Sequence, residues 1–429
     1  MTPRAAQRPI GREAMLSRED NELLVRTGPG TPMGDMIRRY WFPALLSSEL
    51  PEPDGKPVRV RLLGEDLVAF RDTSGKIGLL EEKCPHRCAS LALGVNDKHG
   101  LRCLYHGWKF AVDGRCLERP TEPGGANSGH NIRAVAYAAH EAGGVVWAYM
   151  GPAELKPDFP DLNWLNMKEG HAVPFKIQED CNYAQAVEGT IDTAHAGVLH
   201  REQPWDAPAK YDHEKDLAPK LEVQFTTYGM RYASVRKIGG GQQHVRITQV
   251  LLPFGTMIPP AGEGAPDIIK HRRLVNYFVP RDDESTWHIQ WFFDETRPIN
   301  VAHRIEEGGI WLHDDFRKKV NIDVWYNQDR EWMKSGMMSG IKGVVTQDHA
   351  VCETQGRILD RTKEHLGTSD MAVVAWRRMM LKAARALQEK GEAPPGAQGG
   401  VSWNAITAET VKLPEARSWK EDVPGVNVA

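Results

Sequence analysis

Hydrophobic and polar residues alternate in short runs over the first third of the chain. Such runs lie at 58–63, 67–70, 77–80, 108–110 and 145–150. Turn-forming sequences separate them, for example Asp-Thr-Ser-Gly-Lys ahead of the third run. Alternation with a period of two is typical of half-buried strands, and evenly spaced short strands favour a sandwich or barrel. We therefore predict a small antiparallel β domain here.

A second series of such runs follows a linker punctuated by Pro152, Pro157 and Pro160. Strands are expected at 221–227, 230–237, 245–253, 273–280 and 287–294, and helices at 180–200, 311–321 and 372–390. The C-terminal residues are poor in aliphatic side chains, which predicts an extended tail. The elements predict an α+β protein with four parts: an N-terminal segment with a short helix at 1–40, the β domain at 41–155, a second domain at 160–392 and the tail at 393–429.

Composition excludes several classes of protein. The 429 residues include 41% hydrophobic and 26% charged residues, and the net charge of −3 argues against a nucleic-acid partner. No apolar run approaches the roughly 18 residues that a membrane span requires. The first fourteen residues lack the apolar core of a secretory signal, and Met15 could be the natural start. We expect a cytoplasmic protein, in which the six cysteines are metal ligands or buried thiols rather than disulfides.

Two cysteine–histidine pairs stand in the predicted β domain. Cys84-Pro-His86 is followed, after sixteen intervening residues, by Cys103-Leu-Tyr-His106. Two thiolates and two imidazoles on separate loops are typical of a Rieske [2Fe–2S] centre. A structural zinc site could use the same donors, but one residue between Cys84 and His86 is fewer than zinc sites usually have. The spacing therefore favours the cluster.

A third motif, Asp192-Thr-Ala-His195-Ala-Gly-Val-Leu-His200, falls in the predicted helix at 180–200. Asp192 and His195 would share one helix face, whereas His200 would lie about 140° away on a regular helix. Binding of one metal by both imidazoles would thus require a distorted helix, for example through a π-type turn near Gly197. Two histidines and a carboxylate form the facial triad of non-haem Fe(II) oxygenases.

With these motifs in the order found, residues 15–400 resemble the large subunit of Rieske non-haem iron aromatic-ring oxygenases, in the phthalate dioxygenase and aryl O-demethylase branch. The resemblance implies an all-β Rieske domain followed by a helix-grip (START-like) catalytic domain with a large antiparallel sheet. It implies one [2Fe–2S] cluster and one mononuclear Fe(II) per subunit. The implied residues are Cys84 and Cys103 on one cluster iron, His86 and His106 on the other, His195 and His200 on the mononuclear iron, and Asp192 as a carboxylate that links the centres of neighbouring subunits.

The family places its third iron ligand far downstream, in a Gln-Asp-x-x-x-x-Glu-Thr-Gln-Gly setting. Here the sequence is Gln-Asp348-His349-Ala-Val-Cys-Glu353-Thr-Gln-Gly, so Asp348 is the implied ligand and Glu353 the alternative. We interpret His349 as an ordinary polar residue, because the triad is complete without it. Cys88 departs from the family pattern, and we interpret it as a small buried thiol.

The resemblance also implies an activity: O2 and electrons from NADH, delivered by a separate reductase that uses flavin or iron–sulfur centres, dihydroxylate an aromatic carboxylic acid of the phthalate type. The alternative is an O-demethylating monooxygenase acting on a methoxylated aromatic acid. The family assembles as homotrimers or multiples of trimers. Arg231, Arg236 and Arg246 interrupt the strands; solvent exposure is the expected state of each, but one facing the substrate would bind a carboxylate.

Two other classes remain. A Rieske electron carrier would not need the long segment after the β domain with Asp192, His195, His200 and Asp348. A binding module that has lost its mononuclear iron would be distinguished by its iron content.

Overall fold

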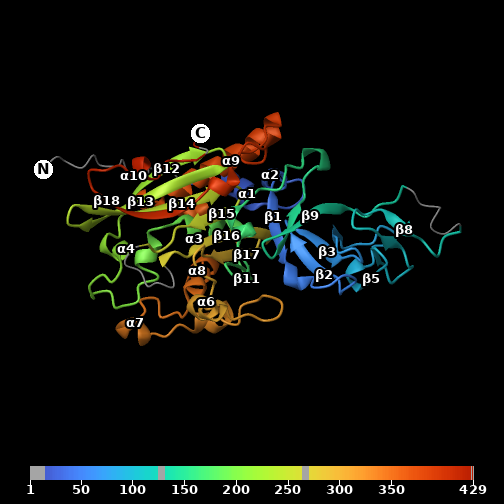
Figure 1. Cartoon of the computed structure of the whole chain (residues 1–429), viewed down its shortest axis with the longest axis horizontal. Helices are drawn as coiled ribbons and strands as arrows, with labels where there is room; N and C mark the ends of the chain where they lie inside the picture. The colour runs from blue at the N-terminus through green and yellow to red at the C-terminus, as the bar shows by residue number, and fades with distance from the viewer. Residues whose placement is uncertain (1–14, 124–130, 263–269, 427, 429) are drawn as a thin grey trace.

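The computed structural model describes residues 15–123, 131–262, 270–426 and 428. An N-terminal β domain forms one end of the molecule, and a large sheet with its helices forms the rest (Figure 1). The described helices are α1 (Arg18–Val25), α2 (Pro32–Ile37), α3 (Tyr183–Ile191), α4 (Asp212–Lys215), α6 (Val301–Gly308), α7 (Trp332–Ser335), α8 (Val344–Glu353), α9 (Met371–Lys390) and α10 (Trp419–Asp422).

The β domain consists of two antiparallel sheets. The larger has the strand order β1-β10-β9-β4-β3-β2, and the smaller has the order β5-β6-β7-β8. Their bounds are β1 (Trp41–Leu46), β2 (Val58–Leu62), β3 (Glu65–Arg71), β4 (Ile77–Glu81), β5 (Val95–Asp97), β6 (Gly100–Arg102), β7 (Lys109–Phe110), β8 (Cys116–Glu118), β9 (Ala136–Ala142) and β10 (Val145–Tyr149). Phe70, Leu80, Leu101 and Phe110 form a core between the sheets. The β domain predicted from alternation is confirmed.

The sheet of the second domain is antiparallel throughout and has the order β11-β17-β16-β15-β14-β13-β12. The bounds are β11 (Ala172–Glu179), β12 (Lys220–Thr226), β13 (Gly229–Gly239), β14 (Gln242–Leu251), β15 (Gly255–Ile258), β16 (Arg273–Asp282), β17 (Ser285–Phe293) and β18 (Glu409–Pro414). Helix α9 packs on β12 and β13, α3 packs on β15 and β16, and the two helices touch each other. This arrangement confirms the α+β class with a large antiparallel sheet.

Helix α9 shows why the sequence forms this layer. Its buried residues Val373, Trp376, Met380 and Ala384 recur every three or four positions, which makes one apolar stripe. Trp376 meets Tyr183 of α3 edge to face, with ring centroids 6.4 Å apart. Gly391 then ends the helix in a left-handed conformation. The helix predicted at 372–390 is therefore confirmed.

Two predicted features differ in the structure. Residues 311–321 do not form a helix; Leu312 and Lys318 instead form an isolated antiparallel bridge, because their side chains are used in separate contacts rather than along one face. The C-terminal residues are not merely an extended tail. β18 pairs with β14 from Gln242↔Pro414 to Ile247↔Glu409, so backbone hydrogen bonds hold a segment that has few aliphatic residues.

None of the described helices is long and apolar enough to cross a membrane.

Candidate metal centres and an adjoining basic face

Two similar loops of the β domain carry the cysteine–histidine pairs. In the first, Cys84 N–H donates to Ala89 O and Cys88 N–H donates to Cys84 O. In the second, Cys103 N–H donates to Trp108 O and the N–H of the residue after His106 donates to Cys103 O. Each loop thus turns back on its own cysteine and presents that thiol next to a histidine.

The loops bring the four predicted ligands together. The imidazoles of His86 and His106 lie 4.4 Å apart, and Trp108 stacks on His86 at 4.4 Å with parallel rings. Cys84 and Cys103 are buried. Burial raises the pKa of Cys84 to about 11, with a contribution from the neighbouring Cys103 thiol. Burial makes it unfavourable for a free thiol to ionise. A bound metal stabilises the thiolate and so removes this penalty.

The spacing of the donor atoms separates a cluster from zinc. A single tetrahedral zinc would gather all four donors within about 4 Å of one another. Among the described residues, two groups of three or more metal-ligating atoms lie within 4.8 Å of one another, and neither includes a residue of these loops. Two thiolates and two imidazoles are the donor set of a Rieske two-iron cluster.

Cys88 is exposed, so the prediction of a buried thiol is wrong. It has a positive φ of 58° at the turn of the first loop. This conformation turns the side chain away from the packed interior.

His195, His200 and Asp348 converge in the second domain. An Asp348 carboxylate oxygen lies 3.1 Å from His200 Nε2 and 3.6 Å from His195 Nε2. The two imidazole centroids are 5.1 Å apart, and one donor atom from each residue lies within 4.8 Å of the others. Two imidazoles and one carboxylate, all half-buried, fit the ligand set of a mononuclear Fe(II).

The helix predicted at 180–200 ends early, and this is how the histidines meet. Helix α3 stops at Ile191, Asp192 caps it, and a short 3₁₀ turn runs from His195 to Gly197. The predicted π-type distortion is therefore not formed. Gly197 serves packing instead, since a Cβ there would lie 2.6 Å from the Leu217 side chain.

Hydrogen bonds fix the orientation of the two imidazoles. His200 Nδ1 lies 2.7 Å from Gln347 Oε1, and Gln347 Nε2 donates to Ile341 O, so the amide can only accept from His200. His195 Nδ1 lies 3.7 Å from Asp192 Oδ2. Burial would raise the pKa of Asp192, but these contacts outweigh it and the pKa is lowered. Both histidines thus direct Nε2 at Asp348. Sequence reasoning missed Gln347, although its place beside Asp348 was a usable signal.

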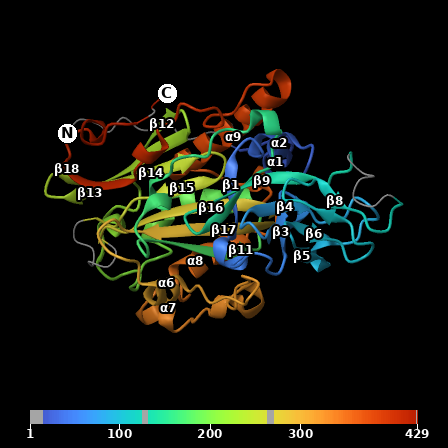
Figure 2. The same cartoon turned by 45° about the vertical axis from the view of Figure 1, so that its right-hand side comes forward.

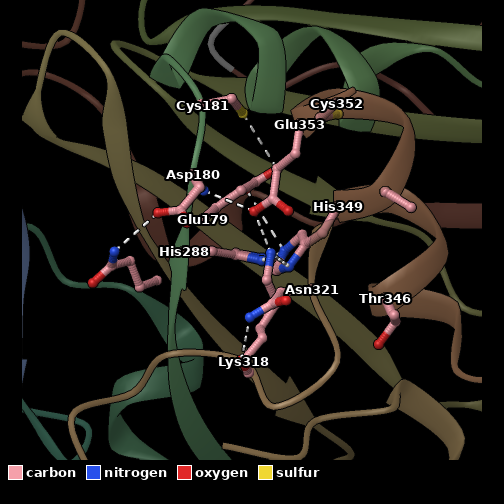
Figure 3. Close-up of polar contacts among 12 residues, drawn as sticks. Glu179, Asp180, Cys181, His288, Lys318, Asn321, Thr346, His349, Cys352 and Glu353 are labelled. Carbon is pink, nitrogen blue, oxygen red and sulfur yellow. Dashed lines mark hydrogen bonds and ion pairs between the residues drawn. The ribbon is translucent and has the colours of Figure 1, made fainter. Parts of the chain in front are cut away.

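Glu353, the alternative ligand, lies elsewhere. It accepts hydrogen bonds from Tyr326 Oη at 2.6 Å and from Asp180 N–H at 2.7 Å, and it pairs with Lys318 (Figure 3). These contacts satisfy its carboxylate away from the two histidines. The geometry therefore favours Asp348 over Glu353.

His349 points from α8 toward the buried polar groups around Glu353 (Figure 3). It lies against His288 and Lys318, and Glu179 Oε2 is 3.6 Å from its Nε2. Burial, helped by the Glu353 carboxylate and opposed by Lys318, raises the pKa of Glu179 to about 8. Glu179, His288 and His349 form the second group of closely spaced donor atoms.

Strands β13 and β14 present a basic face next to the two histidines. Arg236 pairs with His244 across the strands, and Arg246 pairs with Ser234 on the same face. His213 of α4 adds a further imidazole. We call Arg236, His244, Arg246 and His213 the basic face. The positive charge of Arg246 opposes protonation of both His200 and His213. Arg236 reaches the turn that carries His195, since its Nη2 donates to Thr193 O.

The basic face lacks acidic partners. Within the described part of the chain, neither Arg236 nor Arg246 forms an ion pair with a carboxylate. Burial, with the charge of Arg246, lowers the pKa of Arg236 to about 10. Burial and the same arginine lower the pKa of His244 to about 4. The expectation that these arginines are solvent-exposed is wrong, because their strands turn this face inward against the loop after α3.

The three predicted arginines have different surroundings. Arg236 donates to the backbone oxygens of Thr193 and Asp216, so neutral acceptors hold it. Arg246 makes one long bond, of 3.4 Å, to Pro259 O, and its buried Nε has no partner among the residues that the structure describes. Arg231 lies outside the site: it donates to Val423 O and stacks on a tryptophan of α10. Arg246 is therefore the guanidinium best placed to bind a further anion.

Comparisons with known proteins agree with this arrangement. Residues 40–134 match the Rieske [2Fe-2S] domain family, and residues 148–422 match the family described as LigXa C-terminal domain like. The phthalate 4,5-dioxygenase oxygenase subunit of Pseudomonas putida is 40% identical over 396 residues, which cover 87% of each chain. The 3-chlorobenzoate-3,4-dioxygenase oxygenase subunit of Comamonas testosteroni is 36% identical, covering 94% of this chain and 96% of that one.

A third relative is named for a different reaction. The 5,5'-dehydrodivanillate O-demethylase oxygenase subunit of Sphingobium sp. is 33% identical, covering 89% of this chain and 83% of that one. Among solved structures, NdmA of Pseudomonas putida CBB5 with caffeine superposes with a TM-score of 0.62 at 17% identity, covering 86% and 97% of the two chains. This likeness shows a shared fold.

Proposed function

The chain belongs to the Rieske oxygenases, as the oxygenase component of an aromatic dioxygenase or demethylase system, and from this premise we propose that it dihydroxylates an aromatic carboxylic acid of the phthalate type. It is an O2-incorporating oxidoreductase with a [2Fe–2S] cluster and a mononuclear iron. When bound, the cluster supplies single electrons and the iron activates dioxygen next to the substrate.

We assign the metal ligands from the cysteine–histidine loops of the β domain and from the group of His195, His200 and Asp348. Cys84 and Cys103 hold one cluster iron, and His86 and His106 hold the other. The mononuclear iron is held by three residues, His195, His200 and Asp348, whose donor atoms lie within 4.8 Å of one another. Three protein ligands leave coordination positions open for dioxygen. Asp192 orients His195 and is the proposed link to a neighbouring subunit.

The unpaired basic face carries the proposal of an acidic substrate. A buried guanidinium without a carboxylate is costly, and a bound anion removes that cost. Arg246 Nε and His244 Nδ1 are buried polar atoms without a partner in the described residues. An aromatic carboxylate that accepted a hydrogen bond from Arg246 would be oriented with its ring toward the triad. The charge of Arg236 would add to the attraction without a direct bond.

O-demethylation of a methoxylated aromatic acid is the second candidate. It is favoured by the relative that is an O-demethylase oxygenase subunit at 33% identity. The same metal ligands and the same basic face would serve it. The two reactions differ in which carbon of the substrate lies nearest the iron.

We also propose that the oxygenase works with a separate NADH-dependent reductase and assembles as a trimer. The relatives are named as subunits of oxygenase systems. The small sheet β5–β8, next to the cluster loops, lies at the far end of the molecule from β13 and β14 (Figure 2). Leu104 and Tyr105 of the second cluster loop are 62% and 54% exposed, as expected for a loop that meets another protein chain.

Replacement of Arg246 tests the substrate class. We expect Arg246→Gln to raise the Kd of phthalate about 10- to 30-fold, because one charge-assisted hydrogen bond of about 1.5–2 kcal/mol is lost. Binding of the neutral phthalamide should stay unchanged. The matched control is Arg231→Gln, which removes a buried arginine that lies outside the site. Wild-type affinity of Arg246→Gln for phthalate in calorimetric titrations would exclude the acidic substrate at this face.

A further inference from the structure

A directional chain of hydrogen bonds runs from α8 across three strands of the large sheet. Asn276 Nδ2 donates to Thr256 Oγ1 at 3.3 Å, which leaves Asn276 Oδ1 to accept from His288 Nε2–H at 2.9 Å. His288 Nδ1 is then an acceptor and takes the Nε2–H of His349 at 3.0 Å. His349 Nδ1 accepts from Lys318 Nζ at 3.1 Å. Each tautomer follows from its neighbour along the chain.

All five side chains are buried, and they come from separate elements. Thr256 lies on β15, Asn276 on β16, His288 on β17 and His349 on α8, while Lys318 comes from the loop before α7. We call them the α8 tether. At its outer end, Lys318 also pairs with a carboxylate at the C-terminal end of α8, so the loop and the sheet hold the same helix (Figure 3).

The tether uses the donor atoms that would otherwise suit a cation. Glu179, His288 and His349 bring three such atoms within 4.8 Å. His288 Nδ1 and His349 Nε2, however, already bond to each other, and the Lys318 ammonium lies 3.1 Å from the remaining nitrogen of His349. A positive charge is therefore present where a metal ion would add another. The cluster is better suited to hold α8 than to bind a metal.

We infer that the α8 tether is a positioning device for Asp348, and this inference rests on the proposed role of Asp348 as an iron ligand. Asp348 precedes His349, and adjacent helix residues differ by about 1.5 Å in height and 100° in direction. With His349 held against the sheet, Asp348 is directed toward His195 and His200. Metal–ligand distances are expected to stay within about 0.2 Å of their usual values, so a small movement of α8 would weaken iron binding by Asp348. The hydrogen bonds of His288 go to Asn276 and His349 rather than to a proposed iron ligand, so His288 is a positioning residue.

The experiment uses the holoprotein and replaces His288. His288→Phe keeps a ring that can stack on Phe278, whose centroid is 4.5 Å away, but removes both hydrogen bonds. Fe(II) affinity is measured by chelator competition, and the ligand field by the EPR spectrum of the Fe(II)–nitric oxide adduct. We expect about 10- to 100-fold weaker Fe(II) binding and an altered spectrum, the usual range for loss of an outer partner of a metal ligand. The visible absorbance of the cluster should not change.

Two variants separate positioning from general damage. His288→Gln, which can accept from His349 and donate to Asn276, should restore most of the Fe(II) affinity. His171→Phe is the matched control: this half-buried histidine lies directly before β11 and its Nδ1 is 2.8 Å from Asp294 O, so the Fe(II) affinity of the variant should equal that of wild type. Wild-type affinity and spectrum in His288→Phe would overturn the inference.

Folding failure and failure of the premise give distinct results. Should His288→Phe not fold, Thr256→Val removes only the last bond of the tether and should weaken Fe(II) binding by a smaller factor of about two to five; no change would overturn the inference. Asp348→Asn tests the premise. If it retains iron, the ligand assignment fails; if it loses iron while His288→Phe keeps it, the ligand assignment stands and the tether alone is wrong.

Discussion

At the scale of single residues, burial decides what each polar group in the second domain does. The two iron-site histidines have outer partners of different charge: an amide for His200 and a carboxylate for His195. Arg246, by contrast, has a buried donor atom, Nε, for which the described part of the chain offers no partner. Satisfied groups stabilise the fold, and the unsatisfied donor is available to a ligand.

The carboxyl of Glu179 predicts a specific pH dependence of stability. Burial raises its pKa to about 8, whereas an unfolded glutamate titrates near about 4.3. Between these values the folded state binds more protons than the unfolded state, so stability falls as the pH rises, by up to about 1.4 kcal/mol per pH unit. Glu179→Gln cannot ionise, and its melting temperature should fall less than that of wild type between pH 5 and pH 8.

The matched control for this prediction is Glu284→Gln, because Glu284 is exposed. Its melting temperature should follow that of wild type at every pH. Parallel curves for wild type and Glu179→Gln would show that Glu179 is ionised in the folded protein at neutral pH.

At the scale of elements, helix α8 depends on a close backbone approach at its N-terminus. Gly343 has a φ of 91°, and a Cβ there would lie 2.4 Å from Gly309 Cα. Gly309 follows α6, so the two helices meet where neither residue carries a side chain. The start of α8, and with it Asp348, is fixed by this contact.

Alanine at Gly343 should therefore damage both stability and the iron site. We expect the free energy of unfolding to fall by roughly 3–5 kcal/mol, because the positive φ and the clash both disfavour alanine. We also expect a lower iron content. Gly356→Ala is the matched control, since Gly356 has a φ of 96° but open space around it. Its free energy of unfolding should fall by only about 1–2 kcal/mol, and the variant should keep its iron. Equal melting temperatures for the two variants would rule out the close approach as the cause.

Sequence patterns predicted the elements with clear periodicity and the ligands with fixed local spacing. The strands, α9 and the two metal-binding motifs follow from such patterns, as does Asp348 from the family setting around it. The end of α3 at Ile191 was missed because Asp192 takes an extended conformation and its side chain accepts from Ala194 N–H, while no glycine or proline marks this turn in the sequence. The α8 tether was missed because Asn276, His288 and His349 meet only through the sheet.

At the scale of the whole molecule, the two proposed metal centres belong to different domains. The cluster loops extend from the β domain at one end, while the triad lies between α8 and the turn after α3 in the other domain (Figures 1 and 2). The basic face belongs to the second domain, where Arg236 donates to Thr193 O in the turn between Asp192 and His195. Under the proposed function, the first domain supplies electrons and the second binds the substrate and carries out the oxygen chemistry.

The central claim, dihydroxylation of an aromatic acid, is tested most directly by single turnover of the reduced holoprotein with 18O-labelled dioxygen. Phthalates and methoxybenzoates serve as the substrate panel, and mass spectrometry identifies the products. We predict a ring diol of a phthalate that contains two labelled oxygen atoms. A product with one labelled atom, formed together with formaldehyde from a methoxylated acid, would contradict dihydroxylation and establish the O-demethylase instead.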